Sequence, residues 1–409
     1  MRLAWIAHFM LAASASAQVA VKVRTLYPMT GDLAPVSDAV VLCGADGKIV
    51  RVGPAGEVPV PEGWRVMEAE VGLPGLIDAR TTVGLSGVLN WERRDQEQLE
   101  PSGPLQPDLR APDAFNGRDS LVQWVRELGV TTVHTGHSPG ALISGQTMIL
   151  KTDIASVLGP GDMLKPFAGI AATLGSEGFG KGEKQSPGTR AKSVAMLRAE
   201  LIRAKEYQRK VQAAANEPSK LPDRDLRMEA LVSVLRGEVP LIVTADRHHD
   251  IAAALRLREE FAFRLILDGA AEAYLMKEAI RASGVPVLIH PTMARPAGEQ
   301  ENLKLTQAAE LLAAGIPFAF QSGYEPYVPK TRVVLFEAAM AAAHGLPVTE
   351  ALAACTVRPA TILGIQERVG SLAPGLDADV ALYDGDPLET TSHCVATIIN
   401  GKVVSATRR

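Results

Sequence analysis

The segment Pro74-Gly75-Leu76-Ile77-Asp78-Ala79-Arg80-Thr81-Thr82 decides the fold of this chain. It leaves a Pro-Gly turn, continues as a short apolar run and ends in a polar cluster. This pattern predicts a short buried strand whose polar side chains gather at its carboxyl end.

A repeated unit further along the chain predicts more strands of the same kind. A helical stretch ends at Gly, a branched residue and usually Pro follow, and a short apolar run comes next, as in residues 237–243, 284–289 and 315–320. Residues 129–133 repeat the unit without Pro. Gly suits the left-handed end of a helix, and Pro is tolerated where a strand begins. The unit therefore predicts parallel βα units, arranged either as a closed barrel or as an open doubly wound sheet.

Amphipathic helices are expected between these strands. Apolar residues recur every three or four positions over residues 194–211, 251–261 and 305–312. Such stripes are typical of helices that cover a sheet. Residues 90–116 and 175–188 have no clear period and are expected to form long loops, the first of them at the mouth of the barrel.

Both ends of the chain are expected to form β-structure. Strand-like runs occupy residues 19–25, 39–42 and 48–52 near the start, and 380–383 and 396–404 near the end. Asn400-Gly401, inside the last run, is the strongest short signal for a hairpin.

Two segments carry a resemblance to a known family. Residues 74–82 resemble the first barrel strand of the amidohydrolase superfamily, the imidazolonepropionase-like branch in particular, which normally reads Pro-Gly-Leu-Ile-Asp-x-His-x-His. Residues 370–383 are very similar to the closing segment of the same family. The resemblance implies an α/β fold with a (β/α)8 TIM-like barrel and a small β-sandwich built from both chain ends. The corresponding divisions are 1–17 (signal peptide), 18–73 (first half of the sandwich), 74–368 (barrel) and 369–409 (second half).

The resemblance also locates the side chains that hold a divalent metal in the family, where histidines and one aspartate end four of the barrel strands. In this sequence those positions hold Arg80 and Thr82 on the first strand, Thr244 and Asp246 on the fifth, Asp268 on the sixth and Gly323 on the eighth. An arginine has no lone pair to donate, and glycine offers no ligand. No metal of the usual kind is therefore expected, and Arg80 either occupies part of the vacated site or is a surface arginine with a packed stem.

Other polar residues remain as pocket candidates beside Arg80, Asp246 and Asp268. His248 follows the fifth strand, where with His249 it either approaches the site or flanks a helix that starts near Asp250. His290 follows the seventh strand and either binds a ligand or is structural. His134 and His137 form a weak metal pattern that is also compatible with a loop. If an altered metal site exists, it would hold a single divalent ion such as zinc between residues like Asp246, Asp268, His248 and His290.

Composition limits the location and the partners. A net charge of -4 and a pI near 6.1 give no electrostatic footprint for nucleic acid. Arg2, the apolar run over residues 3–13 and Ala15-Ser16-Ala17 predict a signal peptide, so a periplasmic or extracellular protein is expected, with no transmembrane segment after its removal. The three cysteines are either buried free thiols or, for Cys43 and Cys394, a bridge.

Two functions remain open from the sequence. The first is a hydrolase that acts on a carbon–nitrogen, non-peptide bond of a small amide such as a cyclic one, through an altered metal site or metal-free acid/base chemistry. The second is a non-catalytic relative that binds a small-molecule ligand, or that pairs with an active paralogue or with a second copy of itself.

Overall fold

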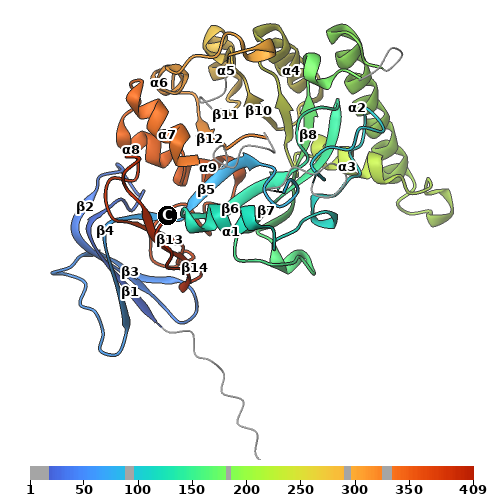
Figure 1. The fold of residues 1–409 in the computed structure, drawn as a ribbon. Coiled ribbons are helices and arrows are strands. Elements are labelled where there is room, and N and C mark those ends of the chain that lie inside the picture. Colours follow the sequence, from blue (N-terminus) through green and yellow to red (C-terminus); the bar gives the residue numbers. More distant parts are fainter. Residues whose placement is uncertain (1–17, 88–95, 181–185, 290–295, 325–333) are drawn as a thin grey trace, which may run out of the picture.

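The computed structural model describes residues 18–87, 96–180, 186–289, 296–324 and 334–409. Figure 1 shows a barrel surrounded by helices and, beside it, a β-domain in which the first and last parts of the chain lie together. The expected signal peptide, residues 1–17, lies outside the described residues.

An eight-stranded sheet forms the barrel. Its strands, in their order across the sheet, are β5 (Leu76–Thr81), β6 (Val130–Gly136), β7 (Ile143–Lys151), β8 (Lys165–Thr173), β9 (Leu241–Thr244), β10 (Leu265–Gly269), β11 (Val287–Ile289) and β12 (Phe318–Phe320). A single parallel bridge between Thr81 and Gly323 brings the first strand next to the last. The sheet is thus nearly closed, and the expected fold class is confirmed.

One strand departs from a fully parallel barrel. Strand β7 runs antiparallel to both β6 and β8, while the pairs from β8 to β12 are parallel. Only six residues, 137–142, join β6 to β7, and a parallel crossover needs about a dozen or more. The short connection therefore forces a hairpin. His134, expected in a loop, lies within β6 as a consequence.

Helices surround the barrel, and the three predicted from apolar periodicity are confirmed as α2, α4 and α6. The helices are α1 (Ser120–Glu127), α2 (Arg190–Ala213), α3 (Leu226–Leu235), α4 (His248–Phe261), α5 (Lys277–Ser283), α6 (Gln307–Ala313), α7 (Val334–Ala343), α8 (Val348–Ala353) and α9 (Val357–Leu363). Short 3-10 helices are η1 (Ala111–Asp113), η2 (Pro160–Asp162), η3 (Ser176–Gly178), η4 (Pro218–Lys220), η5 (Ala273–Leu275) and η6 (Gly298–Gln300). Helix α4 begins at His248, which fits the prediction that this histidine flanks a helix.

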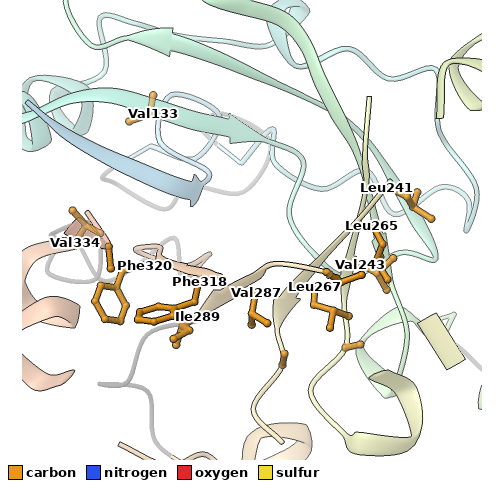
Figure 2. Packing of buried hydrophobic residues seen from close by; sticks show 14 of the residues in the cluster. Val133, Leu241, Val243, Leu265, Leu267, Val287, Ile289, Phe318, Phe320 and Val334 are labelled. Carbon is orange, nitrogen blue, oxygen red and sulfur yellow. The ribbon is translucent and has the colours of Figure 1, made fainter. Parts of the chain in front are cut away.

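Alternation along the strands separates the inside of the barrel from the outside. Figure 2 shows side chains of β9 to β12, such as Leu241, Leu267 and Phe318, packed in the large core of strands and helices. The intervening positions Ile242 and Ile266 form a smaller cluster with Leu288 and Ala319, together with Ala79. Residues two positions further along each strand, including Asp268, consequently share the face of this inner cluster.

The chain ends form the second sheet, as predicted. Its strands, in sheet order, are β15 (Lys402–Ser405), β14 (Cys394–Ile399), β13 (Val380–Tyr383), β4 (Arg65–Pro74), β1 (Val19–Leu26), β2 (Val36–Cys43) and β3 (Ile49–Pro54). Asn400 and Gly401 both have positive φ, at 49° and 72°, as the hairpin turn between β14 and β15 requires. Cys43, Cys355 and Cys394 are buried and free, so the bridge between Cys43 and Cys394 does not form.

A buried ion cluster joins the two sheets. The Lys151 ammonium, at the end of β7, lies 2.8 Å from Asp377 and 2.9 Å from Asp379, and it donates to the Asn400 side chain at 2.5 Å. Arg368 also pairs with Asp377 at 2.7 Å. Removing one partner of a buried ion pair leaves uncompensated charge, which is strongly destabilising.

Within the described ranges, no helix is long and apolar enough to cross a membrane.

Replacing Lys151 by methionine is expected to lower the free energy of unfolding by about 3–5 kcal/mol, because the buried Asp379 carboxylate loses its paired cation, while Asp377 keeps Arg368 and Lys48. Urea unfolding followed by circular dichroism measures the change. The matched control is Lys205→Met on the exposed face of α2, expected to stay within about 0.5 kcal/mol of the parent. Equal effects of the two substitutions would contradict a structural role for this cluster.

Candidate functional site

A polar cluster lies at the carboxyl ends of the barrel strands, with Asp268 of β10 at its centre. Asp268 Oδ2 accepts a hydrogen bond from the Thr244 hydroxyl at 2.6 Å, and Oδ1 accepts one from the Gln321 amide at 2.6 Å. The Tyr324 hydroxyl also donates to Oδ2. Three neutral donors from β9 and from the segment after β12 therefore hold one carboxylate. Active sites of such barrels lie at this face.

Arg80 is the cation of the cluster. Its side chain comes from the end of β5 and is fully buried, with 1% of the residue exposed. Nη1 donates to the Thr81 carbonyl at 3.0 Å, Nη2 donates to the His137 carbonyl, and the guanidinium lies 5.3 Å from the centre of the Tyr324 ring. Nε has no acceptor among the residues described. Within the same residues, no carboxylate lies within 4.0 Å of the guanidinium, so Arg80 has no ion-pair partner there.

Asp78 links strand β5, the first of the barrel, to the segment that follows β12, the last one. Its carboxylate accepts hydrogen bonds from the Ser322 backbone N–H at 3.0 Å and from the Ser322 hydroxyl. That hydroxyl also lies 3.1 Å from the Thr81 hydroxyl. Thr82, two residues beyond Arg80, contacts the Ser86 hydroxyl at 2.8 Å. These contacts fix the backbone on which Arg80 is presented.

Burial keeps two histidines near Arg80 neutral. Burial, and next to it the charge of Arg80, lowers the pKa of His134 to about 3 and that of His137 to about 4. His134 uses both ring nitrogens, Nδ1 at 2.7 Å from the Ala79 carbonyl and Nε2 at 2.8 Å from the Thr147 hydroxyl. His134 is thus a structural residue that ties three strands together.

The Tyr324 hydroxyl stays protonated. Burial and the neighbouring Asp268 carboxylate raise the pKa of Tyr324 well above 10. An ionised phenolate beside that carboxylate would place two negative charges in a buried site, which is unfavourable. Tyr324 is therefore a hydrogen-bond donor to Asp268 at neutral pH.

A charged rim lies beyond the cluster. His248 has 54% of its side chain exposed, and its Nδ1 lies 2.7 Å from Glu272, which also pairs with Arg247 at 3.1 Å. Burial alone would raise the pKa of Glu272, but hydrogen bonds from His248, Asn302 and Arg247 lower it to about 2. Asp246 lies at the inner edge of this rim, where Oδ1 accepts from the Ala271 N–H at 3.1 Å.

The residues singled out in the sequence thus fall into three groups. Arg80, Thr244 and Asp268 are brought together around Tyr324, whereas Asp246 and His248 lie at the rim. His290 lies outside the described residues. Sequence reasoning missed Tyr324 and Gln321; the second could have been found, because it lies two positions after inward-facing Ala319.

The strand-end side chains that the structure describes do not form a site for a divalent metal. Within the portion of the chain that the structure describes, no three His, Cys, Asp or Glu side chains converge as a metal site. Arg80 contributes a positive charge instead of a lone pair, and Gly323 contributes no side chain. The Asp268 carboxylate already accepts three hydrogen bonds, and Asp246 accepts one from the Ala271 N–H.

Comparisons with known proteins agree with this architecture. Residues 208–405 match the model of the Amidohydrolase family. The chain is similar to amidohydrolase tasK of Hapsidospora irregularis, with 26% identity over 399 residues, which covers 90% of this chain but only 39% of that protein's length. An amidohydrolase structure from Thermotoga maritima superposes with a TM-score of 0.87 and 28% identity, covering 96% of this chain and all of the other. Molinate hydrolase shares the fold with a TM-score of 0.56, at 16% identity over 95% of each chain.

Stability is expected to fall between pH 7 and pH 5, because of His134 and His137. Unfolded histidines take up protons below about pH 6.5, whereas the folded ones stay neutral down to about 3 and 4. Each therefore costs about 2 kcal/mol of stability over this interval. Urea unfolding at both pH values measures the slope, and His137→Gln is expected to remove about half of the histidine contribution. An unchanged slope in that variant would contradict the assigned neutral state of His137.

Proposed function

Since this chain belongs to the amidohydrolase superfamily, we propose that it hydrolyses a carbon–nitrogen, non-peptide bond of a small amide, such as a cyclic one, without a bound divalent metal. Membership supports a hydrolase function in general. The finer proposal is supported by one observation above all: a buried guanidinium with an unused N–H lies beside a tyrosine–carboxylate pair, at the barrel face where such enzymes work.

Arg80 supplies the positive charge in this proposal. An amide carbonyl oxygen gains negative charge when water adds to its carbon. The Nε–H of Arg80 has no acceptor in the described part of the chain, so it can donate a hydrogen bond to this oxygen. Because the guanidinium is held by two backbone carbonyls, it is already oriented before a ligand enters. Preorganised charge of this kind is worth more in a buried site than in water.

Asp268 is the base in this proposal. A carboxylate offers about four lone-pair positions, and Thr244, Gln321 and Tyr324 occupy three of them. The remaining one can accept a proton from the attacking water. That proton then passes to the leaving nitrogen as the carbon–nitrogen bond breaks, so that the products are an acid and an amine. Asp268 returns to its ionised form at the end of the cycle.

A second candidate function has its own support. The family resemblance places the usual general base at residue 323, which is a glycine here. Three hydrogen-bond donors already occupy most of the lone-pair positions of the Asp268 carboxylate. A site that lacks the family's usual general base can bind an amide without cleaving it. The alternative is therefore a non-catalytic protein that binds a small amide, alone or as a partner of an active paralogue.

We also propose that the protein is exported, on the basis of the signal-like residues 1–17. Expression of the full chain in a bacterial host should yield a periplasmic protein whose first residue, by N-terminal sequencing, is Gln18. Recovery of the intact N-terminus from the cytoplasm would contradict export.

Hydrolysis of hydantoin and dihydrouracil, followed by proton NMR with and without a chelator, tests the main proposal. Turnover is expected to survive the chelator, because no step requires a metal. Arg80→Met is expected to lower kcat about 100-fold or more, as loss of an oxyanion donor does. The matched control is Arg209→Met on the exposed surface of α2, expected to leave kcat unchanged.

Three results would decide between the hydrolase and the non-catalytic binding protein. Stoichiometric zinc, iron or manganese that survives dialysis, together with activity that the chelator abolishes, would overturn the metal-independent proposal. Thermal stabilisation by hydantoin without any turnover would favour the binding protein. Equal kcat in Arg80→Met and in the parent would remove Arg80 from the chemistry.

A further inference from the structure

A cavity of about 170 Å³ lies beside the polar cluster. We propose that it is a subsite for an uncharged, ring-sized apolar group of the ligand. This inference rests on the proposed function, because it assigns a class of substituent to the amide that the site would bind.

Three loops at the barrel mouth enclose the cavity. Leu99 and Pro104 come from the loop after β5, Gly140 and Ala141 from the β6–β7 turn, and Gly178 and Phe179 from the loop after β8. The first and third loops belong to segments that the sequence marked as long loops. Long loops in compact domains are frequently functional.

The cavity is close to the polar cluster on two sides. The carbonyl of His137 accepts from Arg80, and the next residue, Ser138, donates its N–H to the Gln98 carbonyl at 2.7 Å. Leu99 follows Gln98 directly, and Gly140 lies three residues after His137. On the other side, the Gly140 N–H donates to Thr173 at 3.4 Å. Thr173 pairs in the sheet with Thr244, which holds Asp268.

Glycines set the shape of the walls. A Cβ atom at Gly140 would lie 2.5 Å from Leu99 Cδ2, and one at Gly178 would lie 2.5 Å from the Thr173 carbonyl oxygen. Any side chain at these positions would therefore displace its neighbours. A Cβ atom at Gly103, by contrast, would meet no atom within 4 Å. Gly103 also lines the cavity, so a large side chain can be placed at its wall without displacing a neighbour.

The chemistry of the lining selects an uncharged group. Its described residues are Leu, Phe, Pro, Ala, Gly and Ser, with no ionisable side chain among them. A charged group placed here would lose hydration without gaining a partner among the lining residues that the structure describes. A network of ion pairs contacts the same loop after β8, where the Ser176 N–H donates to Glu299 at 3.0 Å. The charged residues of this network are not part of the described lining: Arg190, Arg247, Glu272 and Glu299.

The size of the cavity selects a single ring. An apolar cavity of about 150 Å³ is enough to bind benzene, and the cavity measures about 170 Å³. Half-buried Phe179 offers an aromatic surface to such a ring. The ligand class that follows is an amide bearing an uncharged aromatic or similar ring.

Binding of benzyl alcohol, as a ring without an amide, tests the subsite by saturation-transfer NMR. The parent protein is expected to bind it, and Gly103→Phe is expected to abolish the signal because the new side chain fills the cavity. Phe179→Ala, which keeps the cavity open, is expected to weaken binding several-fold. Gly159→Phe is the matched control, since this glycine also has open space around its Cβ but lies in the loop at the other end of β7.

Calorimetry with hydantoin and 5-phenylhydantoin then links the subsite to the amide site. The phenyl derivative is expected to bind at least tenfold more tightly to the parent and to Gly159→Phe, and no more tightly than hydantoin to Gly103→Phe. A benzyl alcohol signal that persists in Gly103→Phe, or that is missing in the parent, overturns the subsite. Failure of hydantoin alone to bind overturns the proposed function and leaves the benzyl alcohol result to decide the subsite.

Discussion

The polar cluster at the mouth of the barrel depends on one buried charge, the guanidinium of Arg80. The Arg80 guanidinium occupies the end of the first barrel strand, held by the carbonyls of Thr81 and His137 and packed near Tyr324. A divalent cation about 4 Å away would be repelled by about 8 kcal/mol at an effective dielectric constant of 20. In the described residues, the hydrogen-bond donors around the neighbouring Asp268 carboxylate are neutral side chains.

Much of the fold could be predicted from short sequence patterns. The Gly-x-Pro units gave the positions of β9, β11 and β12, and Asn400-Gly401 gave the last hairpin. These signals work because backbone geometry alone restricts which residues can end a helix or turn a hairpin. The β6–β7 hairpin was not predicted, since its turn lacks such a pair and is set by the length of the connection. The closure of the barrel likewise rested on the family resemblance.

The site could be predicted only in part. The family resemblance identified Arg80, Thr244 and Asp268, because they stand at the strand ends where the family holds its ligands. The sequence could not show that Asp268 would be saturated by hydroxyl and amide donors, since Gln321 and Tyr324 reach it from a segment more than fifty residues away. Nor could it show that His248 would pair with Glu272 at the rim. Such choices depend on which long-range partners the folded chain brings within hydrogen-bond distance.

The order of strands in the second sheet has a consequence for folding during synthesis. Strand β4 lies between β1 and β13, and Pro74 is paired with Val380, about three hundred residues later. While a ribosome is still making the barrel, one side of β4 has no neighbour and presents bare amides and carbonyls. Because a sheet edge of this kind invites pairing with other chains, β4 stays open to such pairing until β13 has been synthesised and covers it.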